Sequence, residues 1–378
     1  MGDRYPENLF ELLELLERKG VDKSLYWKHI TRFLERKSRR LHKPVHCIFE
    51  LTPLCNFDCK MCYVHLSSSH LSGKKLLSLS QWKQLAVSAR EAGVLTLALT
   101  GGECLTYPDF DGLYVFLVSL GFRVYIMSNG YLIDEKLELF REHRPAGIQI
   151  SIYGSSDDLY EKVTGVRAFN RVYKNILRIR DADIPLRLSI TPSAYMRDDV
   201  IPLIQLAENI DVKYGVNPQL LQPREETERA KEDLSLEEYL DIYRYLNSIH
   251  NQDLKTIDIN EVPMENHDGP QRYGIRCGAG RSSFGIKYDG SMCPCLSLDK
   301  ITVQPLEIGF EAAWKKISDA ADQYPLPFEC GDCVYQKHCL SCVAVHDSAP
   351  VPGHCDPSVC ERMKRLVQEG FIPLKQLC

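Results

Sequence analysis

The sequence lacks the long apolar run that a membrane-spanning helix requires. No apolar stretch reaches the roughly 18–20 residues needed to cross a bilayer. It also lacks an excess of positive charge, since 46 lysines and arginines are set against 51 acidic residues and the net charge is −5. A general nucleic-acid binder needs a dominant basic field. We therefore expect neither a membrane partner nor a nucleic-acid partner.

The amino-terminal segment lacks the layout of a secretory signal peptide. Residues 1–19 are acidic and have helical spacing, without a basic stretch followed by an apolar one. We therefore expect a cytoplasmic protein. A disulfide framework is not expected either, because cytosolic thiols remain reduced.

Cysteine is the residue type present in excess, with 15 copies. Three of them lie between Cys55 and Cys62, and nine lie between Cys277 and Cys360. Thiols grouped in this way indicate metal ions or iron–sulfur clusters. Cys47 stands apart from both groups and fits the role of a small buried apolar side chain.

Residues 1–44 are predicted to form a helical segment. Apolar side chains recur at helical spacing between Glu7 and Arg18, and a second helix follows. The second helix is basic and carries Arg32, Arg36, Lys37, Arg39 and Arg40. These charges form either a solvated face or a docking surface for an acidic peptide.

Residues 45–252 alternate short apolar runs with amphipathic stretches, which predicts right-handed βαβ units. The expected strands are Cys47–Leu51, Leu95–Leu99, Val124–Met127, Ile148–Ile152, Leu186–Ile190 and Val212–Val216. The expected helices are Leu79–Ala92, Phe110–Leu120, Asp134–Glu142, Asp158–Ile179, Asp198–Asn209 and Leu234–Ile249. The predicted fold class is α/β, a partial (β/α)6 barrel of the TIM type. Functional residues of such barrels follow the carboxyl ends of the strands.

Residues 253–378 are expected to form a second, smaller domain. The alternation stops there, and glycine, proline and cysteine dominate. We expect no large core in this tail, so bound metal should hold it together.

Three cysteines follow the first expected strand directly, with the spacing Cys55-x3-Cys59-x2-Cys62. A structural zinc site takes four closed ligands. His65 is the nearest further candidate, and it lies too close to Cys62 to complete such a site. Three thiolates on a four-iron cluster leave one iron open for an outside ligand, which is a catalytic arrangement.

This segment, Leu51 to Tyr63, is similar to the signature of the radical S-adenosylmethionine (SAM) superfamily. The resemblance implies one [4Fe–4S] cluster, held by Cys55, Cys59 and Cys62, whose open iron binds the amino and carboxylate groups of SAM. It also implies that one electron from the cluster cleaves a carbon–sulfur bond of SAM and releases a 5′-deoxyadenosyl radical. The resemblance extends over residues 45–217.

Further elements of the resemblance lie at the ends of later strands. Gly101, Gly102 and Glu103 resemble the Gly-Gly-Glu element of the family. The glycines let the backbone approach the methionyl amino group of SAM, and the carboxylate can pair with its charge. The resemblance also implies that SAM is contacted by Ser128, Asn129, Ser151 and Arg187. Ordinary loop chemistry is the alternative for each of these four.

The tail contains the pattern Cys330-x2-Cys333-x5-Cys339-x2-Cys342, preceded by Cys277, Cys293 and Cys295 and followed by Cys355 and Cys360. The segment Tyr288–Ser291 contains Asp-Gly and predicts a hairpin turn just before Cys293. From the tail alone, zinc sites and iron–sulfur clusters are equally compatible with these cysteines.

Downstream of such a core, the arrangement resembles the SPASM extension, which houses two auxiliary [4Fe–4S] clusters. The resemblance assigns Cys330, Cys333, Cys339 and Cys360 to a distal cluster and Cys277, Cys295 and Cys342 to a proximal one. Cys293 is an extra cysteine that could close the proximal cluster, and Cys355 competes with Cys360. The chain departs from the family in having two residues, and not three, before Cys342.

SPASM proteins mostly modify ribosomally made peptides or mature sulfatases. The stretches Ile148–Gly154 and Val163–Arg167 resemble the peptide-maturing members. We therefore expect an enzyme that modifies a peptide by thioether or carbon–carbon cross-linking or by epimerisation, with a flavodoxin- or ferredoxin-type electron donor. The alternatives are oxidation of a sulfatase active-site residue or of a small molecule, and an electron carrier without enzymatic activity.

Two further expectations concern recognition and hydrogen transfer. The first 45 residues are too few for the leader-binding domain of many peptide maturases. Leader recognition would then fall to the basic helix or to a separate protein, or would not be needed. Cys104 follows Glu103 directly and is a candidate to return a hydrogen atom to a substrate radical. Its alternative role is packing.

Overall fold

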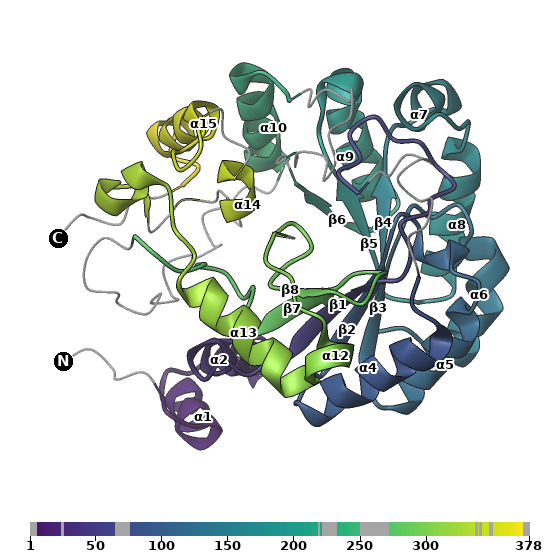
Figure 1. The fold of residues 1–378 in the computed structure, drawn as a ribbon. Helices are drawn as coiled ribbons and strands as arrows, with labels where there is room; N and C mark the ends of the chain where they lie inside the picture. Colours follow the sequence, from purple (N-terminus) through teal and green to yellow (C-terminus); the bar gives the residue numbers. More distant parts are fainter. Residues whose placement is uncertain are drawn as a thin grey trace.

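The computed structural model describes residues 6–23, 26–64, 76–217, 220, 233–249, 272–298, 300–336, 339, 342–347 and 351–372. Its centre is one eight-stranded sheet with the strand order β6-β5-β4-β3-β2-β1-β7-β8. Figure 1 shows the sheet with helices around its outer side. The expected domain boundary between residues 252 and 253 lies outside the described residues.

Six parallel strands form the part of the sheet that the sequence predicts. They are β1 (His46–Glu50), β2 (Thr96–Thr100), β3 (Arg123–Ser128), β4 (Gly147–Ile152), β5 (Leu186–Ile190) and β6 (Lys213–Val216). The bounds of each strand agree with the expected ones to within one residue. The sheet is not closed, so the prediction of a partial α/β barrel is confirmed.

The helices between these strands largely match the prediction. They are α4 (Leu79–Glu91), α5 (Phe110–Ser119), α6 (Ile133–Glu142), α7 (Asp157–Thr164), α8 (Phe169–Asp181) and α9 (Val200–Asn209), and α10 (Leu236–Ile249) follows β6. One prediction is wrong, because residues 158–179 form two helices and not one. Helix α7 ends at Gly165, whose φ of +75° is left-handed and favours glycine.

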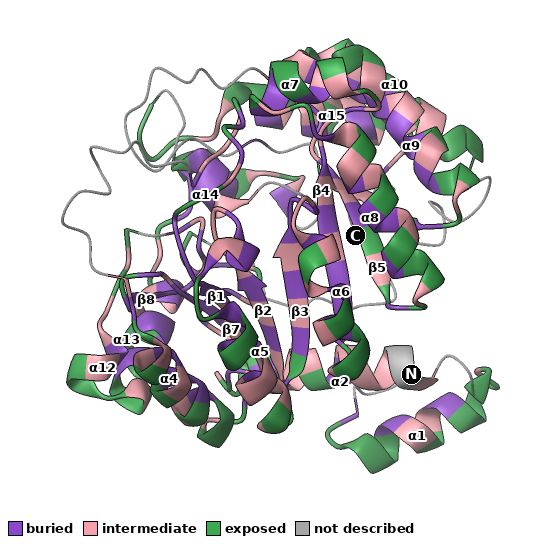
Figure 2. Cartoon of the chain, turned by 90° about the vertical axis from the view of Figure 1, so that its right-hand side faces the viewer, coloured by how far each residue is buried: buried purple, intermediate pink, exposed green. Residues whose placement is uncertain are grey.

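Alternation along the strands divides the sheet into two faces. Leu97, Leu99, Ile126, Ile150 and Leu188 are completely buried and belong to the main hydrophobic core (Figure 2). The intervening residues share the opposite face and include Thr100, Met127, Gln149, Ser151 and Ser189, all partly buried. The sheet therefore has one apolar face under the helices and one more polar face.

Two further strands join the sheet from the cysteine-rich tail. Strand β7 (Ser283–Ile286) pairs in parallel with β1, and β8 (Met292–Cys293) pairs antiparallel with β7. The expected turn at Tyr288–Ser291 lies between them, and its chain reversal is confirmed. The sequence predicts no large core in the tail, and this is wrong for the segment that continues the sheet.

Apolar residues of this segment pack into the main core. Phe284 and Met292 come from the two strands, and Trp314 and Ile317 come from α13 (Phe310–Asp322), which follows the short helix α12 (Pro305–Ile308). The indole nitrogen of Trp314 donates a hydrogen bond to the carbonyl oxygen of His42 at 2.9 Å. Packing against the barrel therefore holds this part of the tail, in addition to any bound metal.

The amino-terminal segment forms two helices, as predicted. Helices α1 (Leu9–Arg18) and α2 (Tyr26–Arg40) pack on each other through Leu12, Leu16 and Phe33. Helix α2 leads directly into β1, so its carboxyl end lies near the start of the sheet (Figure 1).

The carboxyl-terminal helix packs against α10. Helix α15 (Pro357–Gln368) contributes Met363 and Leu366 to a small apolar cluster with Tyr239 and Leu240 of α10. The helix η4 (Phe328–Asp332) and α14 (Val343–His346) precede it. Among the described helices, none has both the length and the apolar character needed to cross a bilayer.

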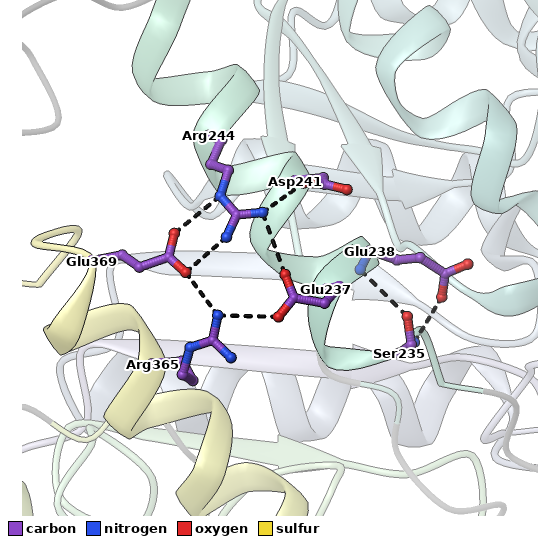
Figure 3. A network of polar contacts seen from close by, with 7 residues as sticks. All are labelled: Ser235, Glu237, Glu238, Asp241, Arg244, Arg365 and Glu369. Atoms are coloured by element: carbon purple, nitrogen blue, oxygen red, sulfur yellow. Dashed lines mark hydrogen bonds and ion pairs between the residues drawn. The ribbon is translucent and has the colours of Figure 1, made fainter.

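A polar network also joins α15 to α10 (Figure 3). The guanidinium of Arg244 contacts the carboxylate of Glu369 at 2.7 Å, and the guanidinium of Arg365 contacts Glu237 and Glu369 at 3.0 Å each. Exposed ion pairs contribute at most about 1 kcal/mol each. The apolar cluster therefore contributes more to the packing of α15 on α10 than these ion pairs do.

We predict that the Phe284→Ala variant unfolds with a free energy about 3–5 kcal/mol lower than that of the wild type. The ring of Phe284 is 1% exposed and its centroid lies 5.5 Å from that of Phe310 and 5.7 Å from that of Trp314. Denaturant unfolding measures the change. Phe328→Ala is the matched control, because Phe328 is 64% exposed. Equal stability of the two variants would contradict the placement of β7 in the core.

Candidate functional site

The loop that carries Cys55, Cys59 and Cys62 leaves the carboxyl end of β1 and is bonded to the segment that follows β2. The Gly102 N–H donates to the carbonyl oxygen of Thr52 at 2.7 Å, and the Glu103 N–H donates to that of Leu54 at 2.8 Å. The cysteine loop and the Gly-Gly-Glu segment, far apart in sequence, thus form one edge-to-edge backbone contact. His65, which follows the loop, lies outside the described residues.

The two glycines make this contact possible. A Cβ at Gly101 would lie 2.5 Å from the carbonyl oxygen of Thr52, and a Cβ at Gly102 would lie 2.7 Å from that of Pro53. Side-chain carbons essentially never approach a backbone oxygen so closely. The glycines therefore admit the cysteine loop against β2, a role that the sequence did not reveal. Their expected approach to SAM stays a prediction.

Glu103 ties the ends of β2 and β3 together. Its side chain is 1% exposed, and its carboxylate accepts hydrogen bonds from the Leu105 N–H at 3.1 Å, the Ser128 hydroxyl at 3.0 Å and the Asn129 N–H at 2.7 Å. Burial raises the pKa of Glu103, and these hydrogen bonds oppose that rise. The Cys104 thiol is a fourth donor, at 3.7 Å from the same carboxylate. The pairing of Glu103 with the amino group of SAM stays a prediction.

Asn129 connects this buried cluster to the first cysteine. Its amide nitrogen donates to the side-chain oxygen of Asn56 at 2.7 Å and to the sulfur of Cys55 at 3.7 Å. The Phe57 N–H also points at that sulfur, at 3.4 Å. Asn129, expected to contact SAM, therefore also positions the cysteine loop, whereas Ser128 contacts Glu103.

Burial and hydrogen bonding act in opposite directions on the Cys55 thiol. Although the residue keeps an exposed surface, desolvation raises the pKa of its thiol to about 11, and the hydrogen bonds from Phe57 and Asn129 oppose the rise. The thiolate, and not the thiol, is the metal-binding form. An iron of a bound cluster would supply the positive charge that stabilises the thiolate.

The end of α7 supports the middle of the same loop. The N–H groups of Asp58 and Lys60 donate to the carbonyl oxygens of Thr164 and Val163, at 2.8 and 3.0 Å. These carbonyls belong to the last turn of α7, which ends at Gly165. The break between α7 and α8 therefore provides acceptors for the cysteine loop.

Tyr153 lies at this site and was not singled out from the sequence. Burial raises the pKa of Tyr153, and the neighbouring Cys59 and Cys62 raise it further. A hydrogen bond with Ser151, two residues earlier at the end of β4, opposes the rise. The phenol thus keeps its proton beside two of the three cysteines. The available signal was its position directly after β4, two residues beyond the predicted site residue Ser151.

Ser151 and Arg187 lie on the more polar face of the sheet. Ser151 pairs in register with Ser189 of β5 near the carboxyl ends of both strands. Arg187 is three positions before the end of β5, which places its backbone about 10 Å from that edge. Its exposed guanidinium lies against Gly215 of β6. Their contacts with SAM stay predictions.

Cys104 is completely buried and lies in the main core. Its thiol donates to the carbonyl oxygen of Met127 at 3.3 Å. Burial raises its pKa, and the neighbouring Glu103 raises it further. These contacts favour packing, and a role as hydrogen donor stays a prediction.

The tail cysteines divide into two groups in space. In the first, which we call the proximal group, Cys342 lies near Cys277 and Cys295; burial raises its pKa most, and the two neighbouring thiols raise it further. Cys295 and Cys342 also border the same apolar cluster, which contains Ile275. These are the three cysteines that the resemblance places on one cluster.

The second group, which we call the distal group, contains Cys330, Cys333, Cys339, Cys355 and Cys360. The sulfur atoms of Cys330 and Cys355 are 3.7 Å apart. Burial raises the pKa of Cys330, Cys355 and Cys360. At Cys330 and Cys360 the thiols of Cys333 and Cys339 raise the pKa further, whereas a hydrogen bond with Cys355 opposes the rise. Both candidates for the last ligand, Cys355 and Cys360, thus lie in the same group.

Glu329 connects two segments of the chain beside the distal group. Its carboxylate contacts the His354 ring at 2.6 Å and accepts from the Cys355 N–H at 2.9 Å, which lowers the pKa of Glu329 to about 2. Among the described residues, no three histidine, cysteine or carboxylate side chains surround one point closely enough for a single metal ion. The assignment of these cysteines to clusters stays a prediction.

The comparisons with known proteins agree with this arrangement. Residues 49–207 match the family model described as Radical SAM superfamily. The subtilosin biosynthesis protein AlbA of Bacillus subtilis (strain 168) is 22% identical over 372 residues, which cover 93% of this chain and 76% of AlbA. The sporulation killing factor maturation protein SkfB of the same strain is 28% identical over 67% of this chain and 60% of SkfB.

Two further comparisons are a sequence match to part of the chain and a match to a solved structure. A probable GTP 3′,8-cyclase of Saccharolobus islandicus is 31% identical over 171 residues. The matched region covers 43% of this chain and about half (52%) of the cyclase. The crystal structure of Streptococcus suis SuiB bound to its precursor peptide SuiA is similar with a TM-score of 0.66 at 17% identity, over 92% of this chain and 87% of SuiB. This likeness shows the fold.

We predict that Gly102→Ala displaces the cysteine loop, because the added methyl group meets the carbonyl oxygen of Pro53 at 2.7 Å. Overpacking of this kind costs about 1–3 kcal/mol. In the cluster-free protein, Cys59, which is 8% exposed, should then react faster with iodoacetamide. Peptide mass spectrometry measures the rate.

Gly112→Ala is the control for this variant, since the nearest atom to its added methyl group is a Leu79 side-chain carbon at 3.7 Å. It should leave the alkylation rate of Cys59 unchanged. If both variants react at the wild-type rate, Gly102 does not hold the cysteine loop in place.

Proposed function

Because residues 49–207 form a radical SAM domain, we propose that this protein is an enzyme that cleaves SAM reductively and modifies a ribosomally made peptide. The observation that carries the proposal is that two backbone hydrogen bonds join the start of the cysteine loop, at Thr52 and Leu54, to Gly102 and Glu103. When bound, a [4Fe–4S] cluster and SAM supply the 5′-deoxyadenosyl radical.

The residues of the chain hold and orient that chemistry. Asn129 and the Phe57 N–H stabilise the Cys55 sulfur as a thiolate, and Glu103 fixes Asn129. The end of α7 fixes the backbone between Cys55 and Cys62. Tyr153 keeps its proton beside Cys59 and Cys62, where it can donate a hydrogen bond. In this proposal, Ser151 and Arg187 reach toward SAM from the more polar face of the sheet.

Three similarities support a peptide as the substrate. AlbA is named for the biosynthesis of a bacteriocin, SkfB for the maturation of a killing factor, and SuiB was solved with a precursor peptide. The match to AlbA includes the tail, because it covers 93% of this chain, whereas the match to the cyclase covers 43%. The modification is a thioether or carbon–carbon cross-link or an epimerisation, and oxidation of a sulfatase residue or of a small molecule is the alternative.

The proposal includes two auxiliary [4Fe–4S] clusters, one at the proximal and one at the distal group. Their thiols lie close together in space although they are far apart in sequence. The proposal further includes a flavodoxin- or ferredoxin-type electron donor and a cytoplasmic location, where such donors and reduced thiols occur together.

The triple variant Cys55→Ala/Cys59→Ala/Cys62→Ala should release no 5′-deoxyadenosine from SAM, since no thiolate then remains for the first cluster. Its tail cysteines are unchanged, so the auxiliary clusters should still form. Anaerobic incubation with dithionite and SAM, followed by chromatography of the products, measures the release. Cleavage at the wild-type rate in this variant would refute the assignment of the site.

Metal content separates iron–sulfur clusters from zinc in the tail. Three four-iron clusters give about 12 irons per chain, whereas a zinc tail gives about four irons and one or two zincs. Elemental analysis after anaerobic reconstitution should find about 12 irons per chain in the wild type. The triple variant should contain about four irons fewer. Stoichiometric zinc would contradict the auxiliary clusters.

A further inference from the structure

Asn56 follows Cys55 directly in the cysteine loop, and only one end of its side-chain amide has a hydrogen-bond partner. The amide oxygen accepts a hydrogen bond from the side-chain nitrogen of Asn129 at 2.7 Å and lies 3.9 Å from the sulfur of Cys55. The amide nitrogen is buried, and no described residue accepts a hydrogen bond from it. Asn56 therefore uses its acceptor and leaves its donor unmatched.

The hydrogen bonds of Asn129 fix which end of the Asn56 amide is the nitrogen. The side-chain oxygen of Asn129 accepts from the Tyr131 N–H at 3.0 Å, so its nitrogen faces Asn56. The opposite orientation of Asn129 would set its nitrogen against the Tyr131 N–H, which is a contact between two donors. The nitrogen of Asn129 in turn requires an oxygen as its partner. The unmatched atom of Asn56 is therefore its nitrogen.

A buried donor without an acceptor destabilises the folded chain, because the N–H group loses its hydrogen bonds to water and gains none in return. Buried side-chain donors in folded proteins nearly always have a partner for this reason. An apolar side chain at position 56 would avoid the penalty altogether. The unmatched donor therefore indicates an acceptor that arrives with a bound group.

The place of Asn56 in the loop indicates which group that is. The sulfur of Cys55 beside it also lies 3.7 Å from the nitrogen of Asn129 and 3.4 Å from the Phe57 N–H. Donors thus gather at the first of the three cysteines. The sulfur atoms of a bound [4Fe–4S] cluster carry negative charge and accept hydrogen bonds, and such bonds help to set its reduction potential.

We propose that the Asn56 amide donates a hydrogen bond to a sulfur atom of the [4Fe–4S] cluster at Cys55, Cys59 and Cys62 and thereby raises its reduction potential. This cluster, called the core cluster below, belongs to the proposed function, on which the inference rests. Reduction adds one electron from the electron donor of that function, and no proton leaves Asn56. The added negative charge strengthens the hydrogen bond, so the bond stabilises the reduced cluster more than the oxidised one.

The test measures the reduction potential of the core cluster in full-length, anaerobically reconstituted protein without SAM. Potentiometric titration is followed by electron paramagnetic resonance. The signal that the triple variant Cys55→Ala/Cys59→Ala/Cys62→Ala lacks belongs to the core cluster. At a fixed potential, Asn56→Ala should decrease the ratio of reduced to oxidised core cluster about tenfold, which corresponds to about 59 mV for a one-electron couple.

Asn56→Asp separates the donor of Asn56 from its acceptor and also serves if the alanine variant does not fold. The aspartate keeps the oxygen that Asn129 binds and lacks the N–H donor. It should decrease the ratio at least as much as alanine does, because its carboxylate also adds negative charge. A decrease in the alanine variant alone assigns the effect to the contact with Asn129 and overturns the proposal. Wild-type ratios in both variants overturn it as well.

Asn247→Ala and Asn247→Asp are the matched controls, because Asn247 is an exposed residue of α10. Both should keep the wild-type ratio, since solvent and salt screen a charge at an exposed position. Equal decreases from the substitutions at Asn56 and at Asn247 would make the effect a general one and overturn the proposal. A decrease that appears only after SAM is added makes SAM the acceptor and overturns the bond to the cluster.

The proposed function is judged separately by the release of 5′-deoxyadenosine from SAM by the wild type. If the wild type cleaves SAM and the Asn56 variants keep its reduction potential, the inference fails and the function stands. If the Asn56 variants lower the potential while the wild type cleaves no SAM, the function fails and the hydrogen bond stands.

Discussion

The structure depends on one close backbone contact, that between Gly101–Gly102 and Thr52–Leu54. It excludes every side chain, because a single methyl group on either glycine would overlap a backbone oxygen. The contact fixes the cysteine loop to the end of β2, and the buried carboxylate of Glu103 extends the connection to Asn129 at the end of β3. The loop that carries the three thiols is therefore held by the ends of three strands, β1, β2 and β3. A flexible loop alone could not hold a cluster in a defined orientation.

The sequence predicts the parts of this site that depend on local pattern. Apolar alternation located all six core strands to within one residue, and the carboxyl ends of those strands located Cys55, Glu103 and Asn129. It did not reveal what each residue contacts. Glu103 and Ser128 contact each other, a pairing across 25 residues that no local periodicity encodes. The helix break at Gly165 was missed because a single glycine within a long amphipathic stretch is a weak signal.

The tail shows the same division between local and distant information. The cysteine spacing and the Asp-Gly turn are local, and both were recognised. The pairing of β7 with β1 was not recognised, because its partners Ser283 and His46 are separated by most of the sequence. The grouping of Cys342 with Cys277 and Cys295 agrees with the family resemblance, but the orientation of Cys293 depends on strand pairing. The orientation of Cys293, whose thiol donates to the carbonyl oxygen of Gly285 at 3.6 Å, was therefore visible only in three dimensions.

The parallel pairing of β1 with β7 has a consequence during protein synthesis. Strand β1 emerges from the ribosome early, and its pairing with β2 leaves one edge of the sheet open until residues 283–286 have been made. Unpaired edges recruit other strands and favour aggregation. Long separation between paired strands also slows folding. The nascent chain therefore carries an exposed strand, next to Cys55, Cys59 and Cys62, for most of the time that its translation takes.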